Sequence, residues 1–350
     1  MELHRRTAWL DETRSPPDLV VVEGGFPSFI DRDRSADGLQ DPTPTARSLA
    51  ESLASMFGPT TRAILHYGSR AQGRASRADS AFDFFIIVDG YRQAYRALAA
   101  NLGMPHHPNL AIVLARVLPP NAISVRHRGP HGEHEAKCVI ASTPHFRREC
   151  SSRARDHFFQ GRVSQCIVLV WSRDPESAEL VLHSVREARE RSFAWARVFL
   201  PRRFDLELYC RTLLEVALAH EIRPEAKNHA DTLFAVQRDT LMGTYGPVLA
   251  RLQDRGILAR DGDAFVQRRL PGPIVKLRVR TYFRFSKLRT TLRLLKHPLL
   301  YDGWLDYLVR KIDRSTGERI ELTARERRWP LIFLWPRALR YLRTRPQHQR

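Results

Sequence analysis

The sequence predicts an α/β protein in which a mixed-sheet domain is followed by a helical domain and a basic amphipathic C-terminal region. Three observations support this prediction. Apolar runs of strand length alternate with helical patterns up to about residue 173, helical patterns alone follow from Pro175 to Gly256, and Lys and Arg gather after Arg268. Because 43% of the 350 residues are hydrophobic, the chain can bury more than one core, and roughly two or three domains are expected.

The chain divides into four parts by composition and pattern. Residues 1–45 are rich in Asp, Arg, Pro and Gly and are predicted to be a lead-in segment with one short strand at 18–23. Residues 46–173 are expected to form the mixed-sheet domain. Residues 174–258 are expected to form the helical domain, for which a winged-helix-like arrangement is one option. Residues 259–350 form the basic amphipathic region.

The elements of the 46–173 domain follow from hydrophobic spacing. Apolar residues at helical spacing predict a helix that ends at Gly58, and further helices are predicted at 90–103 and 144–162. Apolar runs predict strands at 63–67, 82–88, 121–128, 135–142 and 163–171. Asp89 directly precedes the second helix, so we predict that its side chain caps that helix.

Composition excludes several classes of protein. The four cysteines form no CxxC pair, so we expect reduced thiols and no zinc site. No apolar run approaches the roughly 18 residues that a membrane-spanning helix requires, and no export or import sequence is apparent at the N-terminus. The net charge is +19, and residues 268–350 hold 22 Lys and Arg against 6 Asp and Glu. This concentration predicts an anionic partner, either nucleic acid or an acidic bilayer.

The stretch "HYGSRAQGRASRADSAFDFFIIVD" carries the chemistry of the chain. Gly68 permits a turn close to a ligand, Ser69 offers a hydroxyl and an N–H to a phosphate oxygen, and Asp83 lies on the next strand. This order is that of the polymerase-beta-like nucleotidyltransferase fold, in which the turn binds a triphosphate and strand carboxylates bind magnesium. That fold usually has two acids two residues apart, whereas Ala81 stands at the first position here.

One alternative for Asp83 stays open at this point, and one for Asp89 is excluded. Asp83 could be a solvated residue at the start of an ordinary strand. Asp89 cannot replace the acid missing at Ala81, because it lies six residues from Asp83, roughly 20 Å along an extended strand, and the two cannot share one metal ion.

Five segments in collinear order resemble successive motifs of one family. They are "HYGSRAQ", "FDFFIIVD", "AKCVIAS", "DHFFQGRV" and "LPRRFDLELY". Between about residues 60 and 255 the chain resembles the peripheral, mitochondrial-type phosphatidate cytidylyltransferases, a family also known for maintaining the mitochondrial protein translocator. The position of Ala81 is not acidic in that family either, whereas Arg70 stands where the family has a small residue and the loop before Asp83 is shorter.

The resemblance implies a reaction and a cofactor. CTP and phosphatidate would give CDP-diacylglycerol and pyrophosphate, with Mg²⁺ as the metal. Asp83 would bind the metal and act in catalysis, and Gly68 and Ser69 would bind the nucleotide. Lys137 would be a second catalytic residue, because a cation there can bind the triphosphate or the leaving pyrophosphate; the alternative is a surface lysine.

Further candidates have ordinary structural alternatives. Glu135 shares a strand face with Lys137 and could be a second metal ligand or a solvated strand end. Arg162 could bind a phosphate or cap a helix C-terminus. His106 and His107 are weaker candidates, with a plain surface position in a loop as the alternative, and Arg223 is weaker still.

The residue pattern of the basic C-terminal region predicts that the protein acts at a membrane surface. At 280–297, 303–317 and 326–345, Arg and Lys interleave with Leu, Phe, Trp and Tyr, as in segments that lie in a lipid interface. We therefore expect a cytoplasmic protein that is peripheral on the inner face of a membrane, with CTP and phosphatidate as partners. The alternatives are a nucleotidyltransferase acting on nucleic acid or protein, a non-catalytic lipid- or nucleic-acid-binding protein, and an ordinary basic subdomain.

Overall fold

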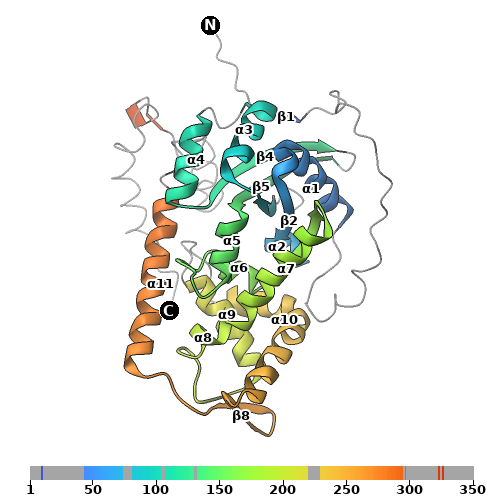
Figure 1. Cartoon of the computed structure of the whole chain (residues 1–350). Helices are drawn as coiled ribbons and strands as arrows, with labels where there is room; N and C mark the ends of the chain where they lie inside the picture. Colours follow the sequence, from blue (N-terminus) through green and yellow to red (C-terminus); the bar gives the residue numbers. More distant parts are fainter. Residues whose placement is uncertain are drawn as a thin grey trace. The chain divides into compact units, whose positions relative to one another are not determined.

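Figure 1 shows a computed structural model of the chain, which forms two compact units, Met1–Lys296 and His297–Arg350. The structure describes residues 9–10, 43–73, 81–103, 107–129, 132–219, 229–294, 296, 322–323 and 325–326. The strand predicted at 18–23, the segment 303–317 and nearly all of 326–345 lie outside the described residues. All elements below belong to the first unit.

A mixed sheet of six strands lies in the upper half of this unit in Figure 1, in the order β1-β4-β5-β3-β2-β6. The strands are β1 (Trp9–Leu10), β2 (Thr61–Tyr67), β3 (Phe82–Val88), β4 (Asn121–Gly129), β5 (Gly132–Ser142) and β6 (Val168–Ser172). β3 runs parallel to β5, and β2 runs antiparallel to both β3 and β6. The predicted α/β class with a mixed sheet is therefore confirmed.

Helices cover the sheet on both faces. One face presents Ala63, Leu65, Phe85 and Ile87 to α5 (Thr143–Cys150), α6 (Gln160–Val163) and α7 (Pro175–Glu190). The alternate residues of β2 and β3, such as Ile64, Phe84 and Ile86, are equally buried on the other face. There α1 (Pro44–Phe57), α3 (Tyr91–Leu102) and α4 (Pro108–Val117) pack together, with α1 against β2 and β6. Sequence analysis did not predict α4.

The helix predicted at 144–162 is wrong, because the chain turns after Cys150. The Glu149 carboxylate accepts hydrogen bonds from the backbone N–H groups of Arg155, at 2.8 Å, and Asp156, at 3.4 Å. These bonds satisfy donors of a loop between α5 and α6 and thereby fix it. The same carboxylate accepts two hydrogen bonds from the guanidinium of Arg148 and lies 3.5 Å from Nε2 of His145, so Glu149 anchors this loop.

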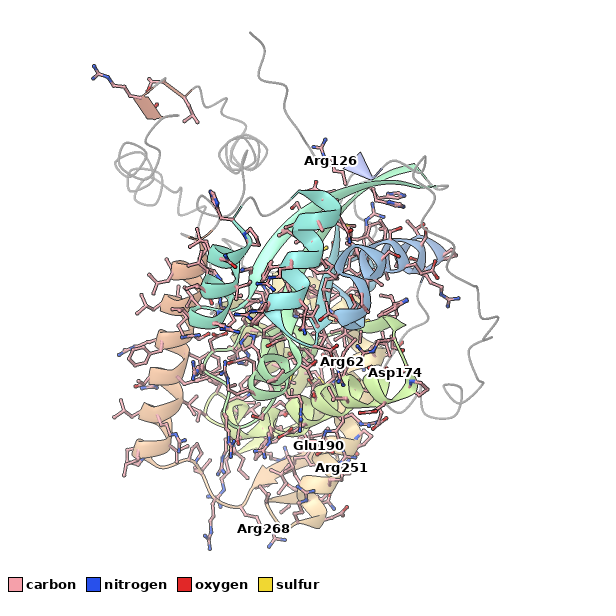
Figure 2. All side chains as sticks on the ribbon, turned by 45° about the horizontal axis from the view of Figure 1, so that its top comes forward. Arg62, Arg126, Asp174, Glu190, Arg251 and Arg268 are labelled. Atoms are coloured by element: carbon pink, nitrogen blue, oxygen red, sulfur yellow. The ribbon has the colours of Figure 1, made fainter. Side chains whose placement is uncertain are left out.

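The predicted cap at Asp89 is also wrong. The residue at the N-terminal cap of α3 is Gly90, and it makes no side-chain capping bond. The Asp89 carboxylate instead pairs with Arg62 and, at 2.8 Å, with Arg173. Figure 2 labels Arg62 and Asp174 at this corner of the sheet, where Asp174 caps α7. Asp89 therefore ties strand ends together and does not start a helix.

The helices after α7 form a second core, whereas α7 itself packs on the sheet. The helices of the second core are α8 (Ser192–Ala196), α9 (Leu206–Ala219) and α10 (His229–Asp254). A small sheet of order β7-β9-β8 joins them, made of β7 (Arg203–Phe204), β8 (Leu258–Asp261) and β9 (Ala264–Gln267). Tyr209, Phe234 and Tyr245 are fully buried in this core. The hydroxyl of Tyr245 donates to the carbonyl of Ser164, which links this core to the sheet domain.

The long helix α11 (Pro273–Leu294) ends the described part of the first unit. It buries Phe283 in the second core and places Ser286 and Arg293 against the loop between α5 and α6. Lys296, just beyond the helix, donates to the carbonyl of Pro120 at 2.8 Å and to Asn121 Oδ1 at 2.7 Å. The middle and the C-terminal end of α11 are thus held by the body of the unit.

Candidate functional site

The Gly-Ser turn lies directly against Asp83. Tyr67, the last residue of β2, pairs with Asp83 of β3, so Gly68 begins the one-turn helix α2 (Gly68–Ala71) beside that carboxylate. Gly68 has φ +82, and a Cβ atom there would lie 2.5 Å from Asp83 Oδ2. Both the backbone conformation and the lack of space require glycine. Ser69, the next residue, is half-buried at the second position of α2.

Lys137 is the neighbour of Asp83 across the sheet. The two residues are in register in the parallel pair of β3 and β5, so their side chains point to the same face. Glu135, two residues before Lys137, also lies on this face at a diagonal position from Asp83. On the other side of β5, Glu135 is in register with Arg126 of β4, which Figure 2 labels. The structure therefore brings together the candidates Asp83, Lys137 and Glu135.

Arg162 approaches the same face from α6. Its guanidinium carbon lies 6.0 Å from the ring centroid of Tyr67 and 3.9 Å from that of Phe158. One of its guanidinium nitrogens donates to the carbonyl of Phe158 at 2.8 Å. Because Tyr67 pairs with Asp83, Arg162 stands at the edge of the Asp83 site, and Phe158 fixes its direction.

The opposite face of the sheet holds a group that sequence analysis missed. His66 is buried between the rings of Phe82 and Phe84, with centroids 5.5 and 5.2 Å away. Burial, and to a smaller extent the charge of Arg70, lowers the pKa of His66 to about 4, so its imidazole is neutral at neutral pH. Arg70 stacks on Phe82 at 4.3 Å. Arg70 thus packs on the strand that carries Asp83.

Three weaker candidates remain, namely His106, His107 and Arg223. His107 is the exposed residue before α4 and makes no side-chain capping bond. His106 and Arg223 are outside the described residues. The structure therefore adds nothing to the case for these three.

The donor set fits magnesium bound together with phosphate. Mg²⁺ is held in proteins by one or two carboxylates plus the oxygens of a substrate phosphate. Asp83 and Glu135 supply two carboxylates on one sheet face, and Lys137 and Arg162 supply positive charge beside them. Among the described residues no group of three His, Cys, Asp or Glu side chains is placed to hold a metal. A metal here would need oxygens from its substrate.

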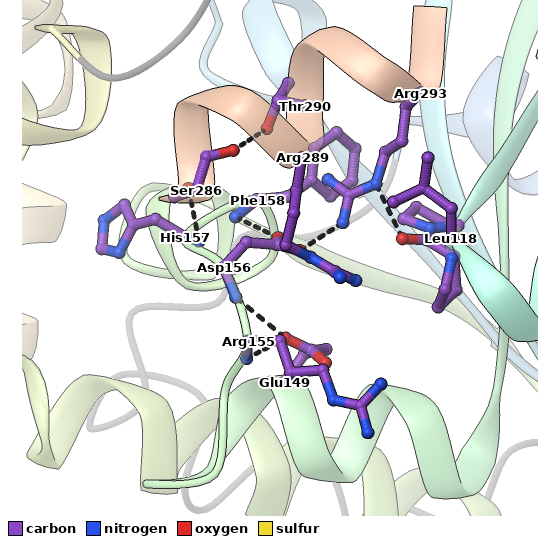
Figure 3. A network of polar contacts seen from close by, with 12 residues as sticks. Leu118, Glu149, Arg155, Asp156, His157, Phe158, Ser286, Arg289, Thr290 and Arg293 are labelled. Carbon is purple, nitrogen blue, oxygen red and sulfur yellow. Dashed lines mark hydrogen bonds and ion pairs between the residues drawn. The ribbon is translucent and has the colours of Figure 1, made fainter. Parts of the chain in front are cut away.

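A second charged cluster adjoins the site and was missed by sequence analysis. Asp156 is buried in the loop between α5 and α6, and its Oδ2 accepts from Arg289 Nε at 3.0 Å and from Arg293 (Figure 3). We call Asp156, Arg289 and Arg293 the Asp156 cluster. In the sequence, only the four-residue spacing of Arg289 and Arg293, which places them on one side of a helix, could have indicated this cluster. Their partner, Asp156, lies more than a hundred residues away in the chain.

Comparison of the chain with protein-family models and with curated proteins finds no match. The site itself consists of a glycine turn against a carboxylate, with the basic side chains of Lys137 and Arg162 nearby. None of the helices in the described part combines the length and apolar composition that crossing a bilayer requires.

Proposed function

We propose that this protein is a magnesium-dependent nucleotidyltransferase with a polymerase-beta-like core, which transfers CMP from CTP to phosphatidate. The observation that carries the proposal is the position of the Gly68 backbone against the Asp83 carboxylate, with Lys137 in register on the next strand. A turn that must be glycine and lies beside a carboxylate and a cation suits a metal-bound triphosphate. The choice of CTP and phosphatidate rests on the resemblance of the sequence motifs.

Each side chain has a role in this reaction. A phosphate oxygen of phosphatidate attacks the α-phosphorus of CTP, the bond from that phosphorus to the β-phosphate oxygen breaks, and pyrophosphate leaves. Gly68 and Ser69 hold the phosphates, and Lys137 and Arg162 offset the charge on the leaving pyrophosphate. Asp83 and Glu135 would hold Mg²⁺, which neutralises phosphate charge when bound.

The outer face of α11 supports a lipid acceptor. Ile274, Leu277, Phe285 and Leu288 are 81, 65, 59 and 53% exposed, and their successive spacings of three, eight and three residues place them along one side of the helix. The exposed cations of the helix are Lys276, Arg278, Arg280, Arg284 and Lys287. Between residues 264 and 301 the sequence has no Asp or Glu. Apolar side chains among cations favour a bilayer interface as the partner. RNA would bind the cations but would leave Ile and Leu exposed to water, whereas a bilayer interface binds both kinds of side chain.

The proposal is tested by product formation at a lipid surface. Purified full-length protein is incubated with Mg²⁺, CTP and vesicles of phosphatidylcholine containing phosphatidate, and pyrophosphate and CDP-diacylglycerol are measured. We expect both products with CTP, and neither with ATP nor with vesicles of phosphatidylcholine alone. Absence of both products in the complete mixture would refute the proposal. Parallel incubation of each labelled nucleotide with RNA or lysate protein examines the other acceptors, and labelling there alone would replace phosphatidate.

A further inference from the structure

The inner face of α11 holds the loop that carries Phe158. The backbone N–H of His157 donates to Ser286 Oγ at 2.9 Å, and the Asp156 carboxylate pairs with Arg289 and Arg293 (Figure 3). Asp156 Oδ1 also accepts from the N–H of Phe158 at 3.1 Å. Two successive residues of the loop are thereby attached to one helix from more than a hundred residues further along the chain, and the next residue, Phe158, is bound to Asp156.

Phe158 connects this helix to the candidate site. The guanidinium of Arg293 lies 5.1 Å from the centroid of the Phe158 ring, and the guanidinium of Arg162 lies 3.9 Å from it. Because Arg162 also donates to the Phe158 carbonyl, a shift of Phe158 moves Arg162. The contacts therefore run without a gap from α11 through Asp156 and Phe158 to Arg162 and Tyr67, beside Asp83.

The electrostatics of the Asp156 cluster explain why it would act as a unit. The side chain of Asp156 is 1% exposed, and a buried carboxylate is costly unless it is paired and hydrogen-bonded. Arg293 is also buried, and its Nε donates to the Pro119 carbonyl at 2.7 Å. Neither charge can reach water without moving the helix or the loop, so the position of one fixes that of the other.

We propose that Asp156, Arg289 and Arg293 are positioning residues, through which α11 sets the place of Arg162 in the phosphate-binding site. This inference rests on the proposed function, and it concerns the phosphates of the nucleotide. Loss of the cluster weakens phosphate binding at the site, while the outer face of α11 and its binding to vesicles are unaffected.

The test compares Arg293→Gln with Arg293→Lys and with a matched control. Arg203→Gln is the control, because Arg203 and Asp261 form an exposed arginine–aspartate pair in the small sheet. Calorimetry measures the affinity of each full-length protein for Mg²⁺-CTP and for inorganic tripolyphosphate, and co-sedimentation measures binding to phosphatidate vesicles. We expect Arg293→Gln to bind both phosphate ligands at least about tenfold more weakly, with a matching rise in KM for CTP and unchanged co-sedimentation. Arg293→Lys keeps the charge and falls between Arg293→Gln and the wild type.

Arg289→Gln provides the same test with less disturbance, since Arg289 is partly exposed and Arg293 still pairs with Asp156 in that variant. Thermal unfolding of each variant shows whether it is folded. Equal affinity of the folded Gln variants and the wild type for tripolyphosphate overturns the inference. If the wild type binds tripolyphosphate but not CTP, the proposed function fails and the comparison continues with tripolyphosphate. If the wild type binds neither, both proposals fall.

Discussion

Asp83 and Asp89 lie at the two ends of β3, and their surroundings differ. The Asp89 carboxylate pairs with Arg62 of β2 and with Arg173 before α7, so it joins three elements. The Asp83 carboxylate is packed against the backbone of Gly68 and lies next to Lys137 across the sheet. Asp89 is thus paired with arginines that join the elements of the fold. Asp83 lies against the turn at Gly68, where there is no space for a side chain. The neighbours of an acid, and not its place on a strand, separate a structural role from a candidate catalytic one.

The comparison predicts that the same substitution has a large effect on turnover at Asp83 and a small one at Asp89. Asp83→Asn removes the charge proposed to hold Mg²⁺, and we expect turnover to fall by about a hundredfold to a thousandfold. Asp89→Asn breaks ion pairs outside the site and should keep most of the turnover. Initial rates of pyrophosphate release with Mg²⁺, CTP and phosphatidate vesicles measure both. Similar rates for the two variants would remove Asp83 from the mechanism.

A second prediction isolates the contact between Gly68 and Asp83. Gly68 and Gly73 both have positive φ, +82 and +66, so alanine at either costs about 1 kcal/mol in backbone strain. A Cβ at Gly73 meets nothing within 4 Å, whereas one at Gly68 meets the Asp83 carboxylate. We expect Gly68→Ala to lose at least about tenfold in turnover and to lower the free energy of unfolding more than Gly73→Ala. Chemical denaturation and rate measurements on both variants test this, and equal effects would show that the close contact is unimportant.

The smallest predicted effect concerns the pH dependence of stability through Asp89. Burial works to raise the pKa of Asp89, but hydrogen bonds from Arg62 and Arg173 outweigh it and hold that pKa below its ordinary value of 3.8. A carboxyl whose pKa is lower in the folded state stabilises the protein above its unfolded pKa, and this contribution is lost as pH falls through the folded pKa. The groups are partly exposed, so we expect Asp89→Asn to lower the free energy of unfolding by about 1 kcal/mol at neutral pH.

Denaturation of the wild type and Asp89→Asn between neutral pH and pH 3 measures this difference. It should shrink as the pH falls below about 4. A constant difference over the whole range would assign the effect of Asp89 to packing and not to charge.

Local patterns predicted much of the sheet and part of the site. β3 was predicted at 82–88 because its apolar run is bounded by polar residues, and Gly68 and Asp83 stood out because a turn and an acid at that spacing suit phosphate chemistry. The helix predicted at 144–162 was wrong because Glu149 binds backbone groups six and seven residues later. The cap at Asp89 was wrong because Arg173, 84 residues away, competes for the same carboxylate. In both errors, a contact that the local pattern does not show decided the structure: Glu149 with the backbone of the following loop, and Asp89 with the distant Arg173.

By itself, the sequence determined the α/β class, the central strands, the glycine turn and the basic C-terminal end, since periodicity, turn residues and charge are properties of neighbouring residues. The tertiary structure alone decided that Lys137 is the strand neighbour of Asp83, because strand order depends on how the whole sheet packs. It also decided that Arg293 meets Asp156, 137 residues away, beside Phe158. Burying a charge requires a partner, and only the folded chain selects which distant residue supplies it.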